Sequence, residues 1–246
     1  MGKKLTTFII EGRLAKPDLI KDMWVLRRAF LELKQSEEED KMYFSRFCQR
    51  EDTYLLTFFD EEKRLQGFFT LTFKPFSKPG SKALLALSKY YYVNSAYRGH
   101  SAITSAAWRV LPKAIWKFGI RPLYVTAFVF PSSYVSLSRT FGGVKTIQEN
   151  KTTDWEQQIL ENFAEDIYGS NWDSTSKLVR NQNAPFEENQ GKTEEIRLLR
   201  EAYEIMNPHW RDGVSVPILT KLDFSTIRSI LSTSLRRMRR GNFAES

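Results

Sequence analysis

Apolar and polar positions alternate in short blocks along the first half of the chain, and these blocks predict a sheet of several strands interrupted by two helices. The strand-like blocks are rich in β-branched and aromatic residues, whereas the helix-like blocks repeat apolar residues every three or four positions. The acidic run 37–40 favours a helix start, because carboxylates stabilise the positive end of the helix dipole. The predicted order is a strand over 6–14, a helix from Pro17 through Leu31, a helix from Glu37, and strands over 53–59, 65–73 and 83–93.

The pattern changes after Val93, where a polar turn leads into a long helix of small apolar residues. Apolar residues recur at helical spacing from Ala102 onward, and we expect Pro112 to kink this helix. A strand over 122–130 and a helix over 131–141 follow. The order strand, turn, helix, strand is a βαβ unit, so its two strands are predicted to be parallel, with a right-handed crossover. In such folds ligands bind at the carboxyl ends of the strands.

The remainder of the chain is less regular. Residues 148–195 are mostly polar and are predicted to form an insertion or lid. A helix over 194–206, a strand over 214–222 and a final helix over 225–240 come next. The sequence therefore predicts an α/β protein with a core over 1–147, the insertion 148–195, and a C-terminal part 196–246 that completes the same domain with a basic helix.

The composition indicates a folded protein without a disulfide framework or a metal ion. With 246 residues, 41% of them apolar, the chain can bury a substantial core. Cys48 is the single cysteine, which excludes a cysteine-rich zinc site, and we expect a buried apolar side chain there. His100 and His209 are too few for a three-histidine metal site. No apolar run approaches the roughly 20 residues that span a bilayer, so we predict no transmembrane segment and a cytoplasmic protein.

The net charge of +8, from 37 basic and 29 acidic residues, is uneven along the chain. Residues 221–246 hold six basic and two acidic side chains, or half of the net charge. An acidic carrier protein, an acidic leader peptide, anionic lipid or RNA would each complement this tail. The mildly basic body argues against nucleic acid as a partner of the whole surface. Four tail arginines fall within five positions, namely Arg236, Arg237, Arg239 and Arg240.

The segment from Tyr92 to Ala102 joins the end of a predicted buried strand to the start of a helix. Helix N-termini present unpaired N–H groups and a partial positive charge, and together these form an anion site. Arg98 adds a fork of donors that suits phosphate, so a pyrophosphate is the expected ligand. Gly99 is the single glycine of this turn and no Lys-Ser/Thr pair follows it, which disfavours a P-loop and a dinucleotide-binding fingerprint.

The six residues Arg98-Gly99-His100-Ser101-Ala102-Ile103 resemble the Arg/Gln-x-x-Gly-x-Gly/Ala loop with which the GNAT superfamily of N-acyltransferases holds the pyrophosphate of acyl-coenzyme A. Arg98 takes the first position of that loop. Ser101 replaces the first motif glycine and Ile103 the final small residue, and we expect these larger side chains to crowd the phosphates. Either the coenzyme sits differently, or the donor is an acyl carrier protein, whose phosphopantetheine brings a single phosphate.

A second stretch, residues 131–142, is similar to the family pattern Asn-x-x-Ala-x-x-Leu-Tyr-x-x-x-Gly. Leu137 and Gly142 fall in register with that pattern. Tyr134 takes the alanine position, and Ser138 takes the position of the tyrosine that often protonates the leaving thiolate. The resemblance therefore implies Tyr134 or Ser138 as the proton donor.

The resemblance implies a GNAT-like α/β fold, with a mixed, mostly antiparallel sheet and a central parallel strand pair, flanked by helices. It implies transfer of an acyl group from acyl-coenzyme A or an acyl carrier protein to an amine, either a small molecule or a peptide. For the base that deprotonates the amine, His100, Glu11 and ordered water are open alternatives. The donor-binding residues that it implies are Tyr92, Val93, Asn94, Arg98, Gly99, His100, Ser101 and Ala102.

Aromatic residues make up 14% of the chain and leave the acyl length open. Aromatic clusters most often form core, yet six phenylalanines near the predicted cleft would also suit a fatty acyl chain. The alternative to an enzyme is a non-catalytic binding module on a degenerate acyltransferase fold, which binds an acidic partner through its basic C-terminal helix. The six phenylalanines are Phe68, Phe69, Phe73, Phe76, Phe128 and Phe130.

Overall fold

The computed structural model describes residues 4–33, 36–98, 100–149, 151–180, 183–185, 193–230 and 232. It divides the chain into two compact units, unit one over Met1–Leu123 and unit two over Tyr124–Ser246. The boundary between these units, after Leu123, differs from the boundaries that the sequence predicts. The predicted division into 1–147, 148–195 and 196–246 stays a prediction. Within the described ranges, no helix combines the length and the apolar composition that crossing a bilayer requires.

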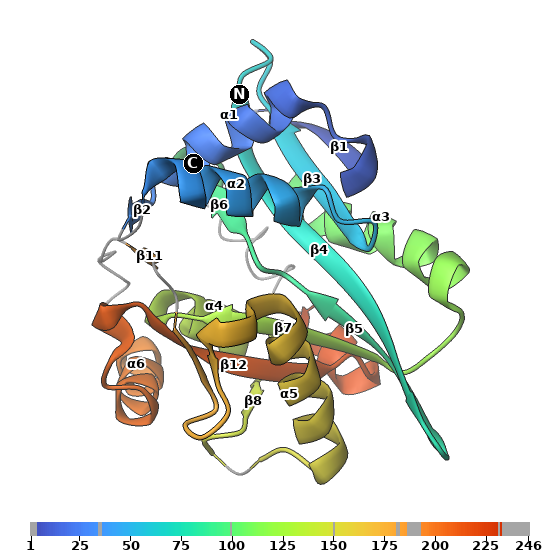
Figure 1. Cartoon of the computed structure of the whole chain (residues 1–246), viewed down its shortest axis with the longest axis vertical. Coiled ribbons are helices and arrows are strands. Elements are labelled where there is room, and N and C mark those ends of the chain that lie inside the picture. The colour runs from blue at the N-terminus through green and yellow to red at the C-terminus, as the bar shows by residue number, and fades with distance from the viewer. Residues whose placement is uncertain are drawn as a thin grey trace. The chain divides into compact units, whose positions relative to one another are not determined.

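Unit one is built on an antiparallel sheet (Figure 1). Its strands are β1 (Thr6–Glu11), β3 (Thr53–Phe59), β4 (Leu65–Lys78), β5 (Ser81–Leu87) and β6 (Tyr91–Val93). They follow in the order β1-β3-β4-β5, and β6 also pairs with β4. Every one of these pairs is antiparallel.

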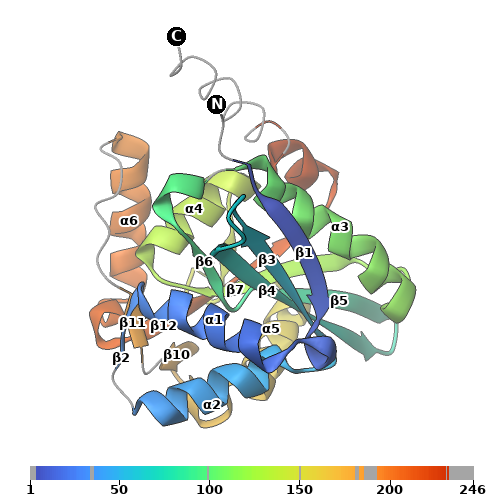
Figure 2. The same ribbon diagram turned by 90° about the horizontal axis from the view of Figure 1, so that it is seen from above.

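Three helices cover the two faces of this sheet. The helices α1 (Pro17–Arg28) and α2 (Glu37–Cys48) pack together on one face, and α3 (Ser101–Phe118) lies on the other (Figure 2). Proline suits the first position of α1 because the N–H that it lacks would have no partner within the helix. The Ser36 hydroxyl caps α2 by accepting a hydrogen bond from the Glu39 N–H.

Shorter elements connect these strands and helices. They are the 3-10 helices η1 (Gly12–Leu14) and η2 (Ser95–Tyr97), and the strand β2 (Leu31–Leu33). Gly12 ends the first strand earlier than predicted, since the chain turns against α2 at this point. A Cβ on Gly12 would lie 2.2 Å from the carbonyl oxygen of Cys48, so no larger residue fits there.

A one-residue β-bulge interrupts the strand that the sequence predicts over 83–93. Leu87 lies opposite Thr72, and Tyr91 lies opposite Phe69. The three residues between Leu87 and Tyr91 therefore face only the two residues between Phe69 and Thr72 on β4. A bulge redirects the side chains that follow it, and bulges are frequent beside functional sites. The predicted strand is thus observed as two segments, β5 and β6.

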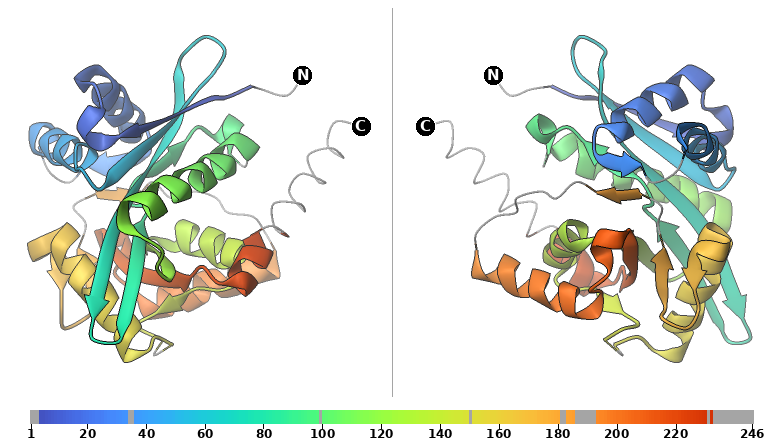
Figure 3. Two further views of the ribbon diagram at one scale, coloured as in Figure 1. Left: turned by 90° about the vertical axis from the view of Figure 1, so that its right-hand side faces the viewer. Right: turned by 60° about the vertical axis from the view of Figure 1, so that its left-hand side comes forward.

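Unit two contains a second set of antiparallel strands, in the order β7-β12-β10-β9, with β8 paired to β12. These strands are β7 (Leu123–Val129), β8 (Lys145–Thr146), β9 (Trp172–Asp173), β10 (Leu178–Arg180) and β12 (Val214–Lys221), and β11 (Asn183–Pro185) is a further short strand. The helices are α4 (Pro131–Phe141), α5 (Asp154–Tyr168), α6 (Glu194–Met206), η3 (Gly169–Asn171) and η4 (Trp210–Asp212). α4 and α6 pack against each other (Figure 3).

The helix α5 lies within the polar segment 148–195. The Thr153 hydroxyl accepts from the Glu156 N–H, and the Glu156 carboxylate accepts from the Thr153 N–H, which is a capping box. Glu156 also accepts hydrogen bonds from Lys145 Nζ at 2.8 and 2.9 Å. The segment therefore contributes a well-capped helix to unit two, and its role as a lid stays a prediction.

The predicted α/β class, with mostly antiparallel strands flanked by helices, is confirmed within each unit. The predicted parallel pair concerns strands that belong to different units and stays a prediction. Residues 225–230 and 232 of the predicted terminal helix are helical, and the helix begins one residue earlier, at Phe224. The four tail arginines, Arg236, Arg237, Arg239 and Arg240, lie outside the described residues.

Candidate functional site

The turn after β6 is held to β4 by Asn94. The Asn94 N–H donates to the carbonyl oxygen of Gln66 at 2.9 Å, and Asn94 Nδ2 donates to Gln66 Oε1 at 2.7 Å. Gly67 allows this close approach, because a Cβ there would make tight contacts of 3.0 Å with the Val93 side chain and 3.1 Å with Tyr92 O. The end of β6 is therefore fixed against β4, and η2 begins directly after it.

Arg98 follows η2, and its side chain folds back toward the end of β6. Its Nε donates to the carbonyl oxygen of Val93 at 3.2 Å. Its guanidinium carbon lies 5.9 Å from the centre of the Phe30 ring. Both contacts restrict the orientation of the guanidinium, whose planar fork of donors suits phosphate or carboxylate.

His100 caps α3 with its own side chain. Its Nδ1 accepts from the Ala102 N–H at 3.2 Å, and its carbonyl oxygen accepts from the Ile103 N–H at 3.0 Å. Two of the first N–H groups of the helix therefore have partners within the chain. Ser101, the first helical residue, is exposed, and the predicted Gly99 lies outside the described residues. An anion at this helix end would compete with the imidazole for the Ala102 N–H.

Tyr92 extends from β6 into an aromatic cluster. Its ring lies 5.6 Å from Phe30, which follows α1, and 5.6 Å from Phe68 of β4. Burial raises the pKa of the Tyr92 phenol, and the nearby Arg27 guanidinium opposes that shift. Phe30 thus contacts both Tyr92 and Arg98. Neither Phe30 nor Arg27 carries a sequence signal for this site, because both reach it through packing between segments far apart in the chain.

A buried ion pair joins α1 to α2 beside this cluster. Arg27 and Asp40 are 4% and 1% exposed. Arg27 Nη1 and Nη2 donate to the two Asp40 oxygens at 2.5 and 3.0 Å, and Trp24 Nε1 donates to Asp40 Oδ2 at 2.8 Å. The guanidinium also lies 5.3 Å from the centre of the Tyr90 ring. These contacts fix α1, and with it Phe30, against the strand that leads to the turn.

The bulge directs two consecutive side chains, Lys89 and Tyr90, toward α2, although neighbouring side chains of a regular strand point to opposite faces. Lys89 Nζ lies 2.8 Å from Tyr43 Oη and 4.7 Å from the centre of the Phe47 ring. The Tyr90 ring lies 5.2 Å from that of Phe47. Burial among these rings lowers the pKa of Lys89 well below its usual value. The sequence gives no signal for this arrangement, because the bulge follows an unbroken apolar run.

The sheet register separates Glu11, one of the candidate bases, from the turn. Glu11 lies opposite Tyr54, which lies opposite Leu71 of β4, whereas Val93 lies opposite Gly67. Four residues along a strand correspond to about 13 Å, and β1 lies two strands beyond β4. The structure therefore does not bring Glu11 to the turn. The histidine of the turn and an ordered water remain as the alternatives.

The two predicted proton donors lie one helical turn apart on α4 in unit two. Tyr134 and Ser138 are 4% and 6% exposed. The Tyr134 ring lies 5.5 Å from that of Tyr203, within an apolar cluster. Burial raises the pKa of Tyr134, so the phenol keeps the proton that a general acid needs. Their role in catalysis stays a prediction.

Five of the six phenylalanines predicted as lining of an acyl pocket take part in core packing, whereas Phe76 is partly buried on β4. Phe68 and Phe73 are fully buried, and Phe69 is 5% exposed. The rings of Phe69 and Phe73 lie 5.8 and 5.9 Å from a neighbouring aromatic ring. In unit two the ring of Phe128 lies 4.5 Å from that of a tyrosine. Such contacts are typical of a close-packed interior, and the acyl length stays open.

Cys48 is fully buried, as the sequence predicts, and burial raises the pKa of its thiol. A thiol in this state is a poor nucleophile. In the part of the chain that the structure describes, no group of three or more histidine, cysteine, aspartate and glutamate side chains is arranged to hold a metal ion.

The turn belongs to a long stretch of sequence without acidic residues. From Lys63 to Gln148 the chain has thirteen lysines and arginines and no aspartate or glutamate. The charge of this stretch of sequence is +13, which favours an anionic ligand.

Solved structures similar to this chain include several acetyltransferases and an acyltransferase. A ribosomal-protein-alanine N-acetyltransferase from Brucella melitensis biovar Abortus 2308 is 17% identical, and the match covers 62% of this chain and 95% of that chain with a TM-score of 0.39. An aminoglycoside 6'-N-acetyltransferase from Acinetobacter baumannii is 12% identical, with 76% and 100% covered and a TM-score of 0.39. An acyl-CoA N-acyltransferase from Pseudomonas aeruginosa is 16% identical, with 58% and 88% covered and a TM-score of 0.36.

No protein-family model matches the chain, and no curated protein sequence matches it. At the identities and TM-scores of the solved structures we draw no conclusion from them about family or activity. The residues of the turn are therefore the basis for assigning a function.

Proposed function

We propose that this chain is an N-acyltransferase that moves an acyl group from a phosphopantetheine thioester to an amine. The observation that supports it is the turn after β6, where Arg98 is anchored on the Val93 carbonyl next to the N-terminus of α3. A guanidinium fork and a helix N-terminus at the end of a strand suit the phosphates of such a donor. The absence of acidic residues from 63 to 148 adds a favourable potential.

In the proposed reaction a neutral amine attacks the thioester carbonyl. The new C–N bond forms, the C–S bond breaks, and the leaving thiolate takes up a proton. Backbone groups near Tyr92 and Val93 would hold the acyl carbonyl, Tyr134 or Ser138 would protonate the thiolate, and His100 or an ordered water would accept the amine proton. Acyl-coenzyme A and an acyl carrier protein both carry this thioester, and acetyl and fatty acyl groups are both open.

Titration calorimetry with coenzyme A, acetyl-coenzyme A, palmitoyl-coenzyme A and an acylated carrier protein tests this proposal. We expect Arg98→Ala to weaken donor binding about 10- to 150-fold, because a hydrogen bond to a charged group contributes about 1.5–3 kcal/mol. Arg109→Ala, an exposed arginine further along α3, is the matched control and should leave donor binding nearly unchanged.

Arg98→Gln separates the charge from the anchoring of the turn, since its amide can still donate to the Val93 carbonyl. If Arg98 acts through its charge, this variant should bind the donor as poorly as Arg98→Ala. Failure of all four donors to bind the unmodified protein would refute the proposal and favour the non-catalytic binding module.

A further inference from the structure

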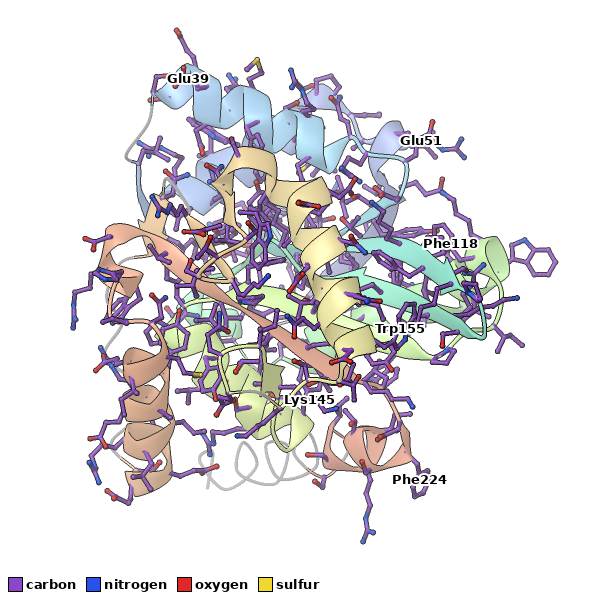
Figure 4. The ribbon with its side chains drawn as sticks, turned by 60° about the horizontal axis from the view of Figure 1, so that its bottom comes forward. Glu39, Glu51, Phe118, Lys145, Trp155 and Phe224 are labelled. Carbon is purple, nitrogen blue, oxygen red and sulfur yellow. The ribbon has the colours of Figure 1, made fainter. Side chains whose placement is uncertain are left out.

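Apolar side chains project from the C-terminal end of α3. Trp116 and Ile120 are 90% and 93% exposed, and Ile115 is 43% exposed. Phe118 marks this end of the helix in Figure 4. Because α3 has 18 residues, this end lies about 25 Å from the turn at its start. The exposed apolar residues are therefore separate from the candidate donor site.

The segment that carries these residues is braced against the β4–β5 hairpin. Arg121 Nη1 donates to Ser77 Oγ at 3.0 Å and to the Phe76 carbonyl at 3.4 Å. The Leu84 N–H donates to the Pro122 carbonyl at 2.9 Å. The segment that follows α3 is thus held against the β4–β5 hairpin within unit one. We call residues 74–82 and 113–121 together the α3–hairpin surface.

The charges on this surface are almost all positive. Both of its segments lie within the acid-free stretch from residue 63 to residue 148. Glu51 borders the surface, where Lys117 Nζ donates to its backbone carbonyl at 2.8 Å. The basic residues of the surface are Lys74, Lys78, Lys82, Lys113, Lys117 and Arg121.

Exposed tryptophan and isoleucine on segments that also carry lysines suit the interface of an anionic bilayer. Tryptophan prefers the depth of the lipid headgroups, and basic side chains around it interact with lipid phosphates. Aliphatic side chains gain from contact with acyl chains. RNA matches the charge, and its bases could stack on Trp116, but Ile115 and Ile120 offer no aromatic face to a base. The combination of charge and aliphatic exposure therefore favours lipid.

We propose that the α3–hairpin surface docks on an anionic lipid bilayer. Trp116 and Ile120 enter the interfacial region, and the lysines on these segments bind the headgroup phosphates. This attachment lies on the membrane surface and needs no membrane-spanning helix. It is independent of the proposed acyl transfer, because the donor site is at the opposite end of α3.

Co-sedimentation of the full chain with vesicles tests this inference. The vesicles consist of phosphatidylcholine alone or of phosphatidylcholine with phosphatidylglycerol, at low and high salt. We expect binding to the anionic vesicles at low salt and loss of binding at high salt or without phosphatidylglycerol. The double variant Trp116→Ser/Ile120→Ser should have a vesicle partition coefficient at least about tenfold lower than that of the parent. Ile205→Ser is the matched control, because Ile205 is 83% exposed on α6 and should not contribute.

The fluorescence of Trp116 reports insertion separately from binding. Tryptophan emission shifts to the blue when the indole leaves water, so anionic vesicles should shift the emission of the parent. Trp116→Phe keeps an apolar ring and should still bind, while most of that shift disappears although five other tryptophans remain.

Equal vesicle binding by the parent and the double variant would refute the proposal, as would no binding to anionic vesicles. Two other results would assign the surface to another partner. They are binding of RNA that requires Trp116, and self-association that requires Trp116, each in a protein that does not bind vesicles. Either outcome would also overturn the proposal.

Discussion

Removal of the Asp40 carboxylate should strongly destabilise unit one. Asp40→Ala removes the carboxylate that accepts from three buried donors, namely Arg27 Nη1 and Nη2 and Trp24 Nε1. It also leaves the Arg27 charge, 4% exposed, without its counter-ion. Breaking a buried pair by removing one partner costs about 3–5 kcal/mol, and we expect a loss in that range. The aromatic rings of Phe44 and Tyr90 lie beside the Arg27 guanidinium. We expect these contacts to persist in Asp40→Ala, but they do not replace the lost carboxylate.

A double-mutant cycle distinguishes the cost of an orphaned charge from the net contribution of the pair. Replacing both residues, as in Arg27→Met/Asp40→Leu, removes the charges and keeps apolar volume, so its stability should lie within about 2 kcal/mol of the parent. Urea denaturation followed by circular dichroism and tryptophan fluorescence measures the parent, Arg27→Met, Asp40→Leu and the double variant, with Asp40→Ala alongside. The exposed pair Arg13–Glu11, at 3.1 Å, is the control, and Arg13→Met should cost less than about 1 kcal/mol. Additive single-variant effects, or a loss below about 1 kcal/mol for Asp40→Ala, would refute the reasoning.

Three further predictions concern other parts of the chain. Although burial raises the pKa of Glu156, hydrogen bonds from Lys145 and Thr153 hold it below its ordinary value of about 4.5. The stabilisation from this carboxylate should be fully present above pH 4.5 and should be lost as the pH falls through the lower pKa of the folded state. The urea denaturation midpoint of Glu156→Gln should depend less on pH. Tyr203→Phe should cost about 1–2 kcal/mol by urea denaturation, because the buried Tyr203 hydroxyl donates to Val129 O at 2.7 Å and accepts from Asn207. Gly12→Ala should cost at least about 2 kcal/mol in the same assay, since its Cβ would lie 2.2 and 2.6 Å from two backbone oxygens, and a wild-type stability would show that the loop shifts freely.

Local chemistry in the sequence locates many of the elements. Acidic residues and a serine cap place the start of α2 at Glu37, and a proline places the start of α4 at residue 131. Gly142 ends α4 in the left-handed conformation, with φ of 76°, as its position after the last apolar residue indicates. Each of these signals acts within a few residues, so a single sequence is enough to read it.

The features that the sequence does not reveal depend on pairing or packing between distant segments. The bulge contains the two polar residues Ser88 and Lys89 within a mostly apolar stretch, but their polarity does not distinguish a bulge from a turn, so only the register with β4 reveals it. β4 continues to Lys78, beyond the predicted end at Phe73, because its polar end pairs with β5. Thr153 and Glu156 do carry a local signal, a capping box, within a segment whose polarity favours a loop.

The candidate site shows the same division. The turn itself follows from the order of strand, glycine-containing loop and helix. Phe30 reaches it because the Arg27–Asp40 pair fixes α1, and neither contact has a sequence signature. A residue that positions a site through a second helix can be found only once the packing of that helix is known.

The departures of the turn from the family pattern have unequal consequences in the structure. Ile103, in the first turn of α3, is 5% exposed and packs inside unit one, and its crowding of the phosphates stays a prediction. The competitor there is His100, whose Nδ1 already accepts from the Ala102 N–H. An anionic donor that binds at this helix end must therefore displace the imidazole from the Ala102 N–H before its phosphate can accept from that group.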